Sequence, residues 1–359
     1  MAKAVIVFSL GVVGLVGSSF LALAQSPDGS GLQSSIAVDI VGKAGNQASG
    51  ESSDRMDVRE AEALFFAPID HLFDGQLNMA AHQEGGEAMF EIHEAFVGST
   101  KLIPRSRFRL GQFFLGFGRL NQFHRHDWPF ISAPKAHREF FGEEGIFDTG
   151  AEYAVLLPTP FVLDFTLGVT NGWTFGHTHS EGKRPLFPTH YGRLLTYLNL
   201  PGDGGMQVGL NYLGRRDADG VKTSIFGFDV TAKWQEAQTL VFLIQSEAYW
   251  RYTTPRDAKT EKGFGGYLYP QYGFSPNWLV GVRSDFFTNL TLEDAGGNKI
   301  NNIDYALVPT LTFKSSEFST WKLAYQFEGR REDGRGHGTN NSVELQATFI
   351  LGAHPAHDF

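Results

Sequence analysis

Apolar and polar side chains alternate at every second position in many segments of this chain. In one segment the odd positions are all apolar, and the even positions from 164 to 170 carry Asp, Thr and Gly; the odd positions are Phe161, Leu163, Phe165, Leu167 and Val169. A period of two over about ten residues is typical of a β-strand with one apolar and one polar face. A strand needs about 9–11 residues to cross a bilayer, so these segments are long enough to do so.

The alternation predicts sixteen strands in all. They are expected at residues 34–46, 55–67, 73–83, 88–100, 105–115, 149–157, 160–172, 189–200, 206–216, 221–235, 238–253, 262–275, 277–291, 301–314, 319–330 and 341–351. Short connections, such as 158–159 and 236–237, alternate with mostly longer and more polar ones, such as 173–188 and 292–300. This order predicts an all-β fold, a transmembrane antiparallel up-and-down barrel with short turns on the periplasmic side and long loops outside.

Aromatic residues support the same orientation, because amphipathic rings favour the two interfaces of a membrane. Three tryptophans lie beside short turns and three aromatic residues lie beside long loops, namely Trp234, Trp278 and Trp321 in the first group and Trp173, Trp250 and Tyr252 in the second. The chain ends in Phe359, the usual last residue of outer-membrane barrels, on a short tail of residues 352–359 that contains Pro355. We expect the barrel-assembly machinery to recognise this terminal residue.

The first 24 residues predict a secretory signal peptide. Lys3 precedes an uncharged apolar run, and Ala22 and Ala24 match the small residues of an A-x-A cleavage site. The alternative is an uncleaved anchor helix, because the apolar run is long for a signal peptide. The mature barrel would then comprise residues 25–359, in the outer membrane of a Gram-negative bacterium.

Composition narrows the possible functions. The formal net charge of −9 argues against a nucleic-acid partner, and the absence of cysteine excludes disulfides, thiolate metal sites and thiol nucleophiles. The sequence also contains no G-x-S-x-G, H-E-x-x-H or P-loop pattern, so we expect no enzyme. A secreted β-sandwich or lectin-like protein is the alternative fold, but several strands carry large aromatic residues on one face and charges on the other.

The connection 116–148 is an outlier, since its 33 residues far exceed an ordinary hairpin loop. Its many Phe and Trp residues favour packing inside the barrel, where the loop would narrow the pore; an extracellular cap is the alternative. The charged residues expected to set the field of this constriction are Arg119, Arg125, Asp127, Lys135, Arg138, Glu143 and Glu144.

The strand before this loop carries Arg105, Arg107 and Arg109 at alternate positions. Three guanidinium groups on one face could form a ladder that binds phosphate or carboxylate groups. A structural network of ion pairs across the barrel wall explains the same residues equally well.

Histidines are grouped in the loops. The His-x-His pairs His124 with His126 and His177 with His179, together with His137, are candidate zinc ligands, with Asp127 or Glu181 as an oxygen ligand. Loop histidines that are merely solvated or packed are the alternative. A pH response of the pore is a further expectation for His124, His126 and His137.

The stretch Arg109, Leu110, Gly111, Gln112 and Phe113, followed by residues 116–119, resembles the phosphate-selective porin (O and P) superfamily. Residues 58–63, 123–129 and 351–359 resemble a subgroup of that superfamily labelled zinc-regulated TonB-dependent outer membrane receptors. The resemblance implies a porin-like channel linked to zinc supply. It also implies that Arg105, Arg107, Arg109 and Lys135 bind anions.

A TonB-dependent transporter needs 22 strands and a plug domain, for which this chain has no room. The sequence therefore predicts an outer-membrane channel for passive diffusion of small hydrophilic solutes, leaning towards anions such as phosphate. Zinc-linked uptake or surface metal binding by the histidine-rich loops is the alternative. By analogy with sixteen-stranded porins, we expect a homotrimer.

Overall fold

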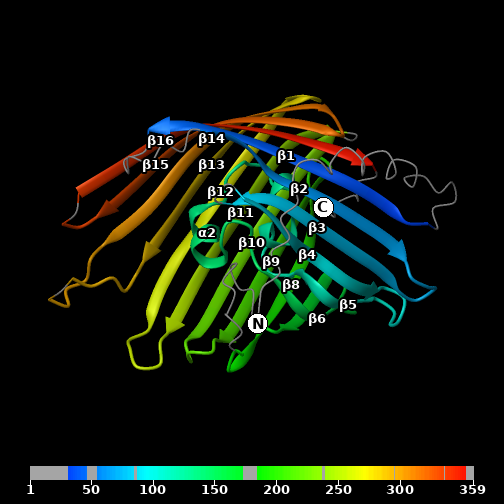
Figure 1. The fold of residues 1–359 in the computed structure, drawn as a ribbon, viewed down its shortest axis with the longest axis horizontal. Helices are drawn as coiled ribbons and strands as arrows, with labels where there is room; N and C mark the ends of the chain where they lie inside the picture. Colours follow the sequence, from blue (N-terminus) through cyan, green and yellow to red (C-terminus); the bar gives the residue numbers. More distant parts are fainter. Residues whose placement is uncertain are drawn as a thin grey trace.

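The computed structural model describes residues 31–46, 55–84, 87–172, 184–236, 239–294, 296–334 and 336–352. In this part of the chain, neighbouring strands pair antiparallel from β1 to β16, and β1 pairs with β16, so the sheet closes into a barrel. Figure 1 shows β1 and β16 side by side although they lie at opposite ends of the sequence. The predicted signal peptide, His177, His179 and the tail residues 353–359 lie outside the described residues.

The prediction of a sixteen-stranded antiparallel barrel is confirmed for the described chain. The strands are β1 Gln33–Asn46, β2 Arg55–Pro68, β3 Asp74–Glu84, β4 Glu87–Ser99, β5 Ser106–Phe114, β6 Phe147–Leu156, β7 Leu163–Thr170, β8 Phe187–Leu200, β9 Gly204–Arg216, β10 Lys222–Glu236, β11 Thr239–Thr254, β12 Glu261–Ser275, β13 Trp278–Asn289, β14 Asn302–Ser316, β15 Ser319–Glu332 and β16 Gly336–Gly352.

Most strand boundaries lie within two residues of the prediction, and two differ by three residues or more for clear reasons. Strand β7 begins at Leu163 rather than at residue 160, because Pro158 and Pro160 cannot donate to a strand ladder. Strand β16 begins five residues early, at Gly336, which pairs with Glu332 of β15. The first residues of β16 are polar, so the alternation of apolar and polar positions does not reveal them as part of a strand. They still pair with β15, because backbone pairing does not depend on apolar side chains.

The barrel wall is apolar on its outer face and polar on its inner face. In β10, Phe226 and Phe228 are exposed on the outside, whereas Asp229 and Thr231 are buried inside. This distribution is the reverse of a soluble protein. It suits a bilayer, because apolar side chains face the lipid while neighbouring strands pair all the way around the closed sheet.

Aromatic residues form pairs at the two ends of the wall. Near the short turns, Trp278 packs on Phe313 and Trp321 on Phe349, with ring centroids 4.5 and 5.6 Å apart. Towards the long loops, Trp250 stacks on Phe264 at 4.6 Å. These pairs lie where the sequence predicts the two interfacial belts, except that Trp173 is outside the described residues.

The described residues include one α-helix, α2 (Lys135–Phe141), and two short 3₁₀ helices, η1 (Leu120–Gln122) and η2 (Arg125–Asp127). All three belong to the connection between β5 and β6. None of the described helices is both long and apolar enough to span a membrane.

We expect an arginine at the middle of a lipid-facing strand to destabilise the barrel. Leu307 lies on the outer face near the centre of β14, so Leu307→Arg should lower the free energy of folding into bilayers by about 2–4 kcal/mol. Ile303→Arg, near the end of the same strand, should cost clearly less, and Leu307→Phe should cost little. Denaturant titration in lipid vesicles measures all three; equal costs at positions 307 and 303 would contradict the membrane placement.

Candidate functional site in the barrel interior

The connection between β5 and β6, residues 115–146, lies inside the barrel and is called the inner loop below. Its helix α2 contacts β11, β12, β13 and β14, which are on the opposite side of the barrel from β2 to β5 (Figure 1). The side chains that it meets point inward: Phe140 packs on Phe287, and Phe130 packs on Tyr267 and Tyr269. The inner loop therefore crosses the lumen rather than covering its mouth.

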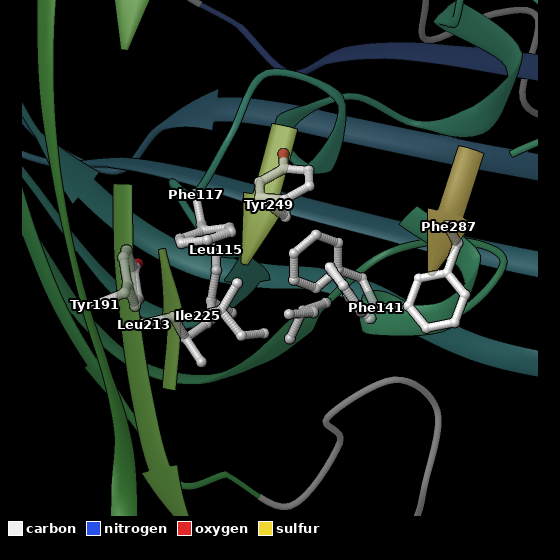
Figure 2. Packing of buried hydrophobic residues seen from close by; sticks show 10 residues of the cluster. Leu115, Phe117, Phe141, Tyr191, Leu213, Ile225, Tyr249 and Phe287 are labelled. Atoms are coloured by element: carbon white, nitrogen blue, oxygen red, sulfur yellow. The ribbon is translucent and has the colours of Figure 1, made fainter. Parts of the chain in front are cut away.

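Aromatic packing fixes the inner loop against the wall. Figure 2 shows Leu115, Phe117 and Phe141 of the loop converging with wall residues of β8 to β11 and of β13. The ring of Phe117 stacks on Tyr249 at 5.7 Å, and Phe141 meets the same tyrosine edge-on at 5.0 Å. A second cluster places Trp128 and Phe130 against β12. Apolar burial of this extent explains why so aromatic a loop does not remain in water.

Charged wall residues anchor the backbone of the inner loop. Glu247 of β11 accepts hydrogen bonds from the backbone N–H groups of Arg119 and Leu120, the second at 2.9 Å. Asp285 of β13 accepts one from the backbone N–H of Lys135 at 3.0 Å. Lys322 of β15 donates to the carbonyl oxygen of Trp128. Hydrogen bonds with a charged partner contribute about 1.5–3 kcal/mol each, so these contacts hold the loop firmly against this wall.

On the opposite wall the inner loop meets a group of buried acids and imidazoles, called the acid–histidine cluster below. Its members come from β2, from β4 and from the inner loop, and they are Glu60, Glu62, His93, His124, His126 and Glu144. Three sets of three within it, each with ligand atoms all within 4.8 Å of one another, have the arrangement of a metal site: Glu62, His93 and His124; Glu60, His93 and Glu144; and Glu60, Glu62 and His126.

Glu62 lies at the centre of the acid–histidine cluster. His124 Nδ1 is 3.1 Å from Glu62 Oε2, and His126 Nδ1 is 3.5 Å from Glu62 Oε1. Asn78 of β3 also donates to Glu62 Oε2, at 2.9 Å. On the other side of His124, Nε2 is 3.4 Å from Glu94 Oε2.

His93 connects the remaining acids. Its Nδ1 is 3.4 Å from Glu60 Oε1 and 3.9 Å from Glu62 Oε1, and its Nε2 is 3.8 Å from Glu144 Oε2. A β-bulge explains its position, because Asn78 and Met79 of β3 pair with Glu94 and Ile92, leaving His93 between them. The bulge directs both His93 and Glu94 inward, against the strict alternation of the strand.

The two loop histidines of the cluster respond to their acidic surroundings. Burial lowers the pKa of His124, but Glu62 and Glu94 outweigh it and raise that pKa well above its ordinary value. Burial likewise lowers the pKa of His126, and Asp127 and Glu62 more than offset it, so this pKa is raised as well. Both rings therefore favour their protonated, positively charged form, which pairs with the buried carboxylates.

His137 is separated from the cluster, although the sequence groups it with His124 and His126. It lies on α2 in a box of aromatic rings, 5.1 Å from Trp128 and 5.3 Å from Phe141. Neither ring nitrogen forms a hydrogen bond, and burial, followed by the charge of Arg125, lowers its pKa to about 3. His137 is thus a neutral packing residue and contributes to none of the candidate metal sites found in the described chain.

The three predicted ladder arginines do not form a continuous row of free charges. Arg105 lies before β5 and donates to the carbonyl oxygens of Leu156 and Leu157. Arg109 forms an ion pair with Glu152 at 2.7 Å and stacks over Phe113. Arg107 is exposed, so it alone of the three offers an open guanidinium. The charges at this end of β5 are largely used in pairing with the wall.

Three of the predicted constriction residues of the inner loop also pair with acids: Arg125, Lys135 and Arg138. Arg125 lies 3.3 Å from Glu144 and 3.8 Å from Glu143. On α2, Arg138 lies 3.6 Å from Glu143 and 3.5 Å from Glu328, and Lys135 lies 2.8 Å from Glu328 of β15. Arg119 contacts Gln207 of β9 at 3.2 Å and lies over the ring of Phe123.

Among the described residues, two cavities lie between the inner loop and the ends of the strands that lead to the short turns. One, of about 220 Å³, lies against β1 to β5 and reaches Glu62, Glu94 and His124. The other, of about 530 Å³, lies against β10 to β16 and is called the short-turn cavity below. His126 and Asp127 line both cavities.

The short-turn cavity is basic. It is lined by four cationic residues and two acidic ones, namely Arg119, Lys233, Lys314 and Lys322 with Asp127 and Glu317. Of this set, only Arg119 and Asp127 are among the site residues predicted from the sequence. The three lysines stand on separate inward strand positions, so no local motif marks them.

Comparison with known proteins agrees with this architecture. Residues 146–354 match the family described as "Putative beta-barrel porin-2, OmpL-like". The chain belongs to this porin family. This protein is therefore a porin-like outer-membrane β-barrel, and its family indicates a channel rather than an enzyme.

A relative from Aquifex aeolicus (strain VF5), described as an uncharacterized protein, is 28% identical over 353 residues, covering 88% of this chain and 73% of that protein. Among solved structures, the anion-selective porin from Comamonas acidovorans has a TM-score of 0.64 at 10% identity, covering 89% of this chain and 99% of that one. The channel DcaP of Acinetobacter baumannii has a TM-score of 0.63 at 12% identity, with coverages of 91% and 99%. These likenesses show the shared porin fold.

The pKa of His137 predicts that this side chain makes an acid-sensitive contribution to stability. Below pH 6.5 the unfolded chain binds a proton at this ring while the folded chain does not, so the contribution of His137 to stability falls as the pH drops from about 6.5 towards 3. His137→Phe removes this term, and its stability relative to the wild type should improve by about 2–3 kcal/mol between pH 6.5 and 4.5. Denaturant titrations at both pH values test this, and a parallel pH dependence of the two proteins would contradict it.

Proposed function

We propose that this porin is a passive channel for small hydrophilic solutes and that the inner loop forms its constriction. The observation that carries the proposal is the position of the loop, which extends from the β2–β4 side of the lumen to the β11–β14 side. Solutes that pass the barrel must pass beside it. On the short-turn side of the loop, His126 and Asp127 line both cavities.

An anion preference is supported by the short-turn cavity rather than by the predicted arginine ladder. Four cations against two acids give this space a positive field, and a basic low-dielectric funnel concentrates anions. Arg107 adds an open guanidinium on β5. Phosphate and small carboxylates are the solutes that such side chains bind well. The fold shared with an anion-selective porin is compatible with this preference but does not carry it.

The cellular setting completes the proposal. We propose that residues 1–24 direct export, that the assembly machinery recognises Phe359, and that the barrel resides in the outer membrane of a Gram-negative bacterium. We also propose a homotrimer; the OmpT barrel of Vibrio cholerae, which shares the fold with a TM-score of 0.58, is described in a trimer form.

Zinc-linked function is the second candidate. The position of His124 and His126 supports a zinc site in the barrel interior rather than on the surface. His124 and His126 lie inside the barrel beside buried carboxylates rather than on an outer loop. His177 and His179 remain proposed surface ligands outside the described residues.

The constriction predicts a clear effect of loop volume on current. Trp128 is buried in the inner loop and lines the short-turn cavity, so Trp128→Ala should widen the passage and raise single-channel conductance in planar bilayers. The matched control is Trp250→Ala, which removes the same side chain from the outer face and should leave conductance unchanged. Equal effects of the two variants, or a folded wild-type barrel that never conducts, would refute the proposal.

The basic cavity predicts ion selectivity. Lys314 is exposed within the short-turn cavity, so Lys314→Glu should shift the reversal potential in a salt gradient towards cation selectivity. Lys259→Glu makes the same charge change on a solvent-exposed residue that pairs with Glu293, and it should shift the potential little. The prediction also requires that the wild-type channel prefer anions. A wild-type channel that is cation-selective would contradict the proposed role of the basic cavity.

A further inference from the structure

We propose that the acid–histidine cluster binds a divalent first-row transition-metal ion through Glu62, His93 and His124, with Glu60, Glu144 and His126 as additional ligands. The ion would join β2, β4 and the inner loop at one point. The proposal rests on four features of the cluster: the spacing of its donor atoms, the burial of its carboxylates, its mixture of donors, and its access to water.

The spacing of the donors matches a coordination shell. A tetrahedral ion with ligands at 2.0–2.1 Å separates those ligands from one another by about 3.3 Å. Within the proposed set, His124 lies 3.1 Å and His93 lies 3.9 Å from Glu62, and the donor atoms of all three residues lie within 4.8 Å of one another. Nitrogen and oxygen atoms therefore converge from three segments of the chain, and small side-chain movements would bring them to the distances that one bound ion requires.

The carboxylates of Glu60 and Glu62 need a positive partner. Both are 3% exposed, and neither Glu60 Oε1 nor Glu62 Oε1 accepts a hydrogen bond of standard geometry. Within the described chain, the ion pairs found for these two acids are with imidazole rings alone. Nearby arginines are engaged elsewhere: Arg59 pairs with Asp39, and Arg125 with Glu143 and Glu144. A divalent cation would compensate two buried negative charges at once.

The donor set selects the class of ion. Two or three imidazoles with carboxylates suit Zn²⁺ and neighbouring transition metals, whereas Ca²⁺ and Mg²⁺ prefer all-oxygen sites. Asn78 donates to Glu62 Oε2 from behind, at 2.9 Å, which is the kind of outer contact that orients a ligating carboxylate.

The ion also has a path to the site. Glu62, His124 and His126 line the cavity of about 220 Å³ between the inner loop and β1 to β5. Water in this cavity could occupy a remaining coordination position, and ions could enter and leave through it. His93 and Glu60 close the site on the side of the wall.

Such an ion would hold the inner loop to the β2–β4 wall, as Glu247, Asp285 and Lys322 hold it to the opposite wall. Removal of the ion would then free one side of the constriction. This consequence rests on the proposed channel function, whereas binding of the ion does not.

Metal binding can be measured on the refolded full-length chain without any conductance assay. After treatment with a chelator, Zn²⁺ is titrated in competition with a chromophoric chelator. Wild type should bind at least one ion, and the double variant His93→Gln/His124→Gln should weaken that binding by more than the roughly 10–100-fold that loss of an outer contact costs. His137→Phe should bind as wild type, because His137 is outside the cluster.

Histidines outside the described residues are tested by His177→Ala/His179→Ala. Unchanged affinity in this variant supports the interior site. Loss of binding there, with binding retained in His93→Gln/His124→Gln, would overturn the proposal, and so would a wild type that binds no Zn²⁺. If the wild type binds no Zn²⁺, protons on the imidazole rings alone neutralise the carboxylates. Glu60→Gln and Glu62→Gln, which preserve shape, provide a second route if the histidine variants do not fold.

X-ray absorption of the zinc-loaded protein supplies a direct signature. It should show nitrogen and oxygen ligands at about 2.0–2.1 Å with imidazole scattering in wild type, and loss of that scattering in the double variant. Conductance with and without chelator then tests the consequence for the loop. Zinc binding in a barrel that does not conduct would overturn the channel function and leave the site intact, whereas conduction without binding would do the reverse.

Discussion

A barrel that faces lipid must place its polar side chains in the lumen, and every charge placed there needs a partner. The outer face of this porin is covered by apolar residues such as Phe226 and Leu307, while Asp229, Glu247 and Arg283 are buried within. Ion pairs between wall residues, such as Arg193 with Asp229 at 2.7 Å, meet part of this requirement. The inner loop meets much of the rest, since its backbone and side chains supply donors to Glu247, Asp285 and Glu328.

The two sides of the inner loop are held by different physics. Towards β11–β14 the contacts are aromatic packing and hydrogen bonds to single charged residues, which do not depend on any dissolved ion. Towards β2 and β4 the contacts are among ionisable groups that gather two or three carboxylates in one place. The second side depends on protons or a cation for its stability. It is therefore the side at which the solution around the protein can act on the inner loop.

Whether a basic residue already forms an ion pair also decides whether it can attract an anion. A guanidinium paired with a buried carboxylate, as Arg109 is with Glu152, has little attraction left for a solute. Lysines at the open end of the lumen, such as Lys314, remain exposed to the solutes of the short-turn cavity. Counting basic residues along a strand is thus a poor guide to selectivity. Their distribution between pairs and cavities decides it.

The sequence by itself determined the barrel, its sixteen strands and the apolar outer face, because a period of two is a local property of each strand. It also indicated an aromatic loop too apolar for water. Only the tertiary structure decided which residues meet. Bulges at Arg59 and His93 turn consecutive residues inward, which alternation cannot reveal, and Glu60, His93 and Glu144 come together over long sequence separations. His137 lies near His124 in the sequence but is buried among rings, because the helix that carries it packs on the far wall.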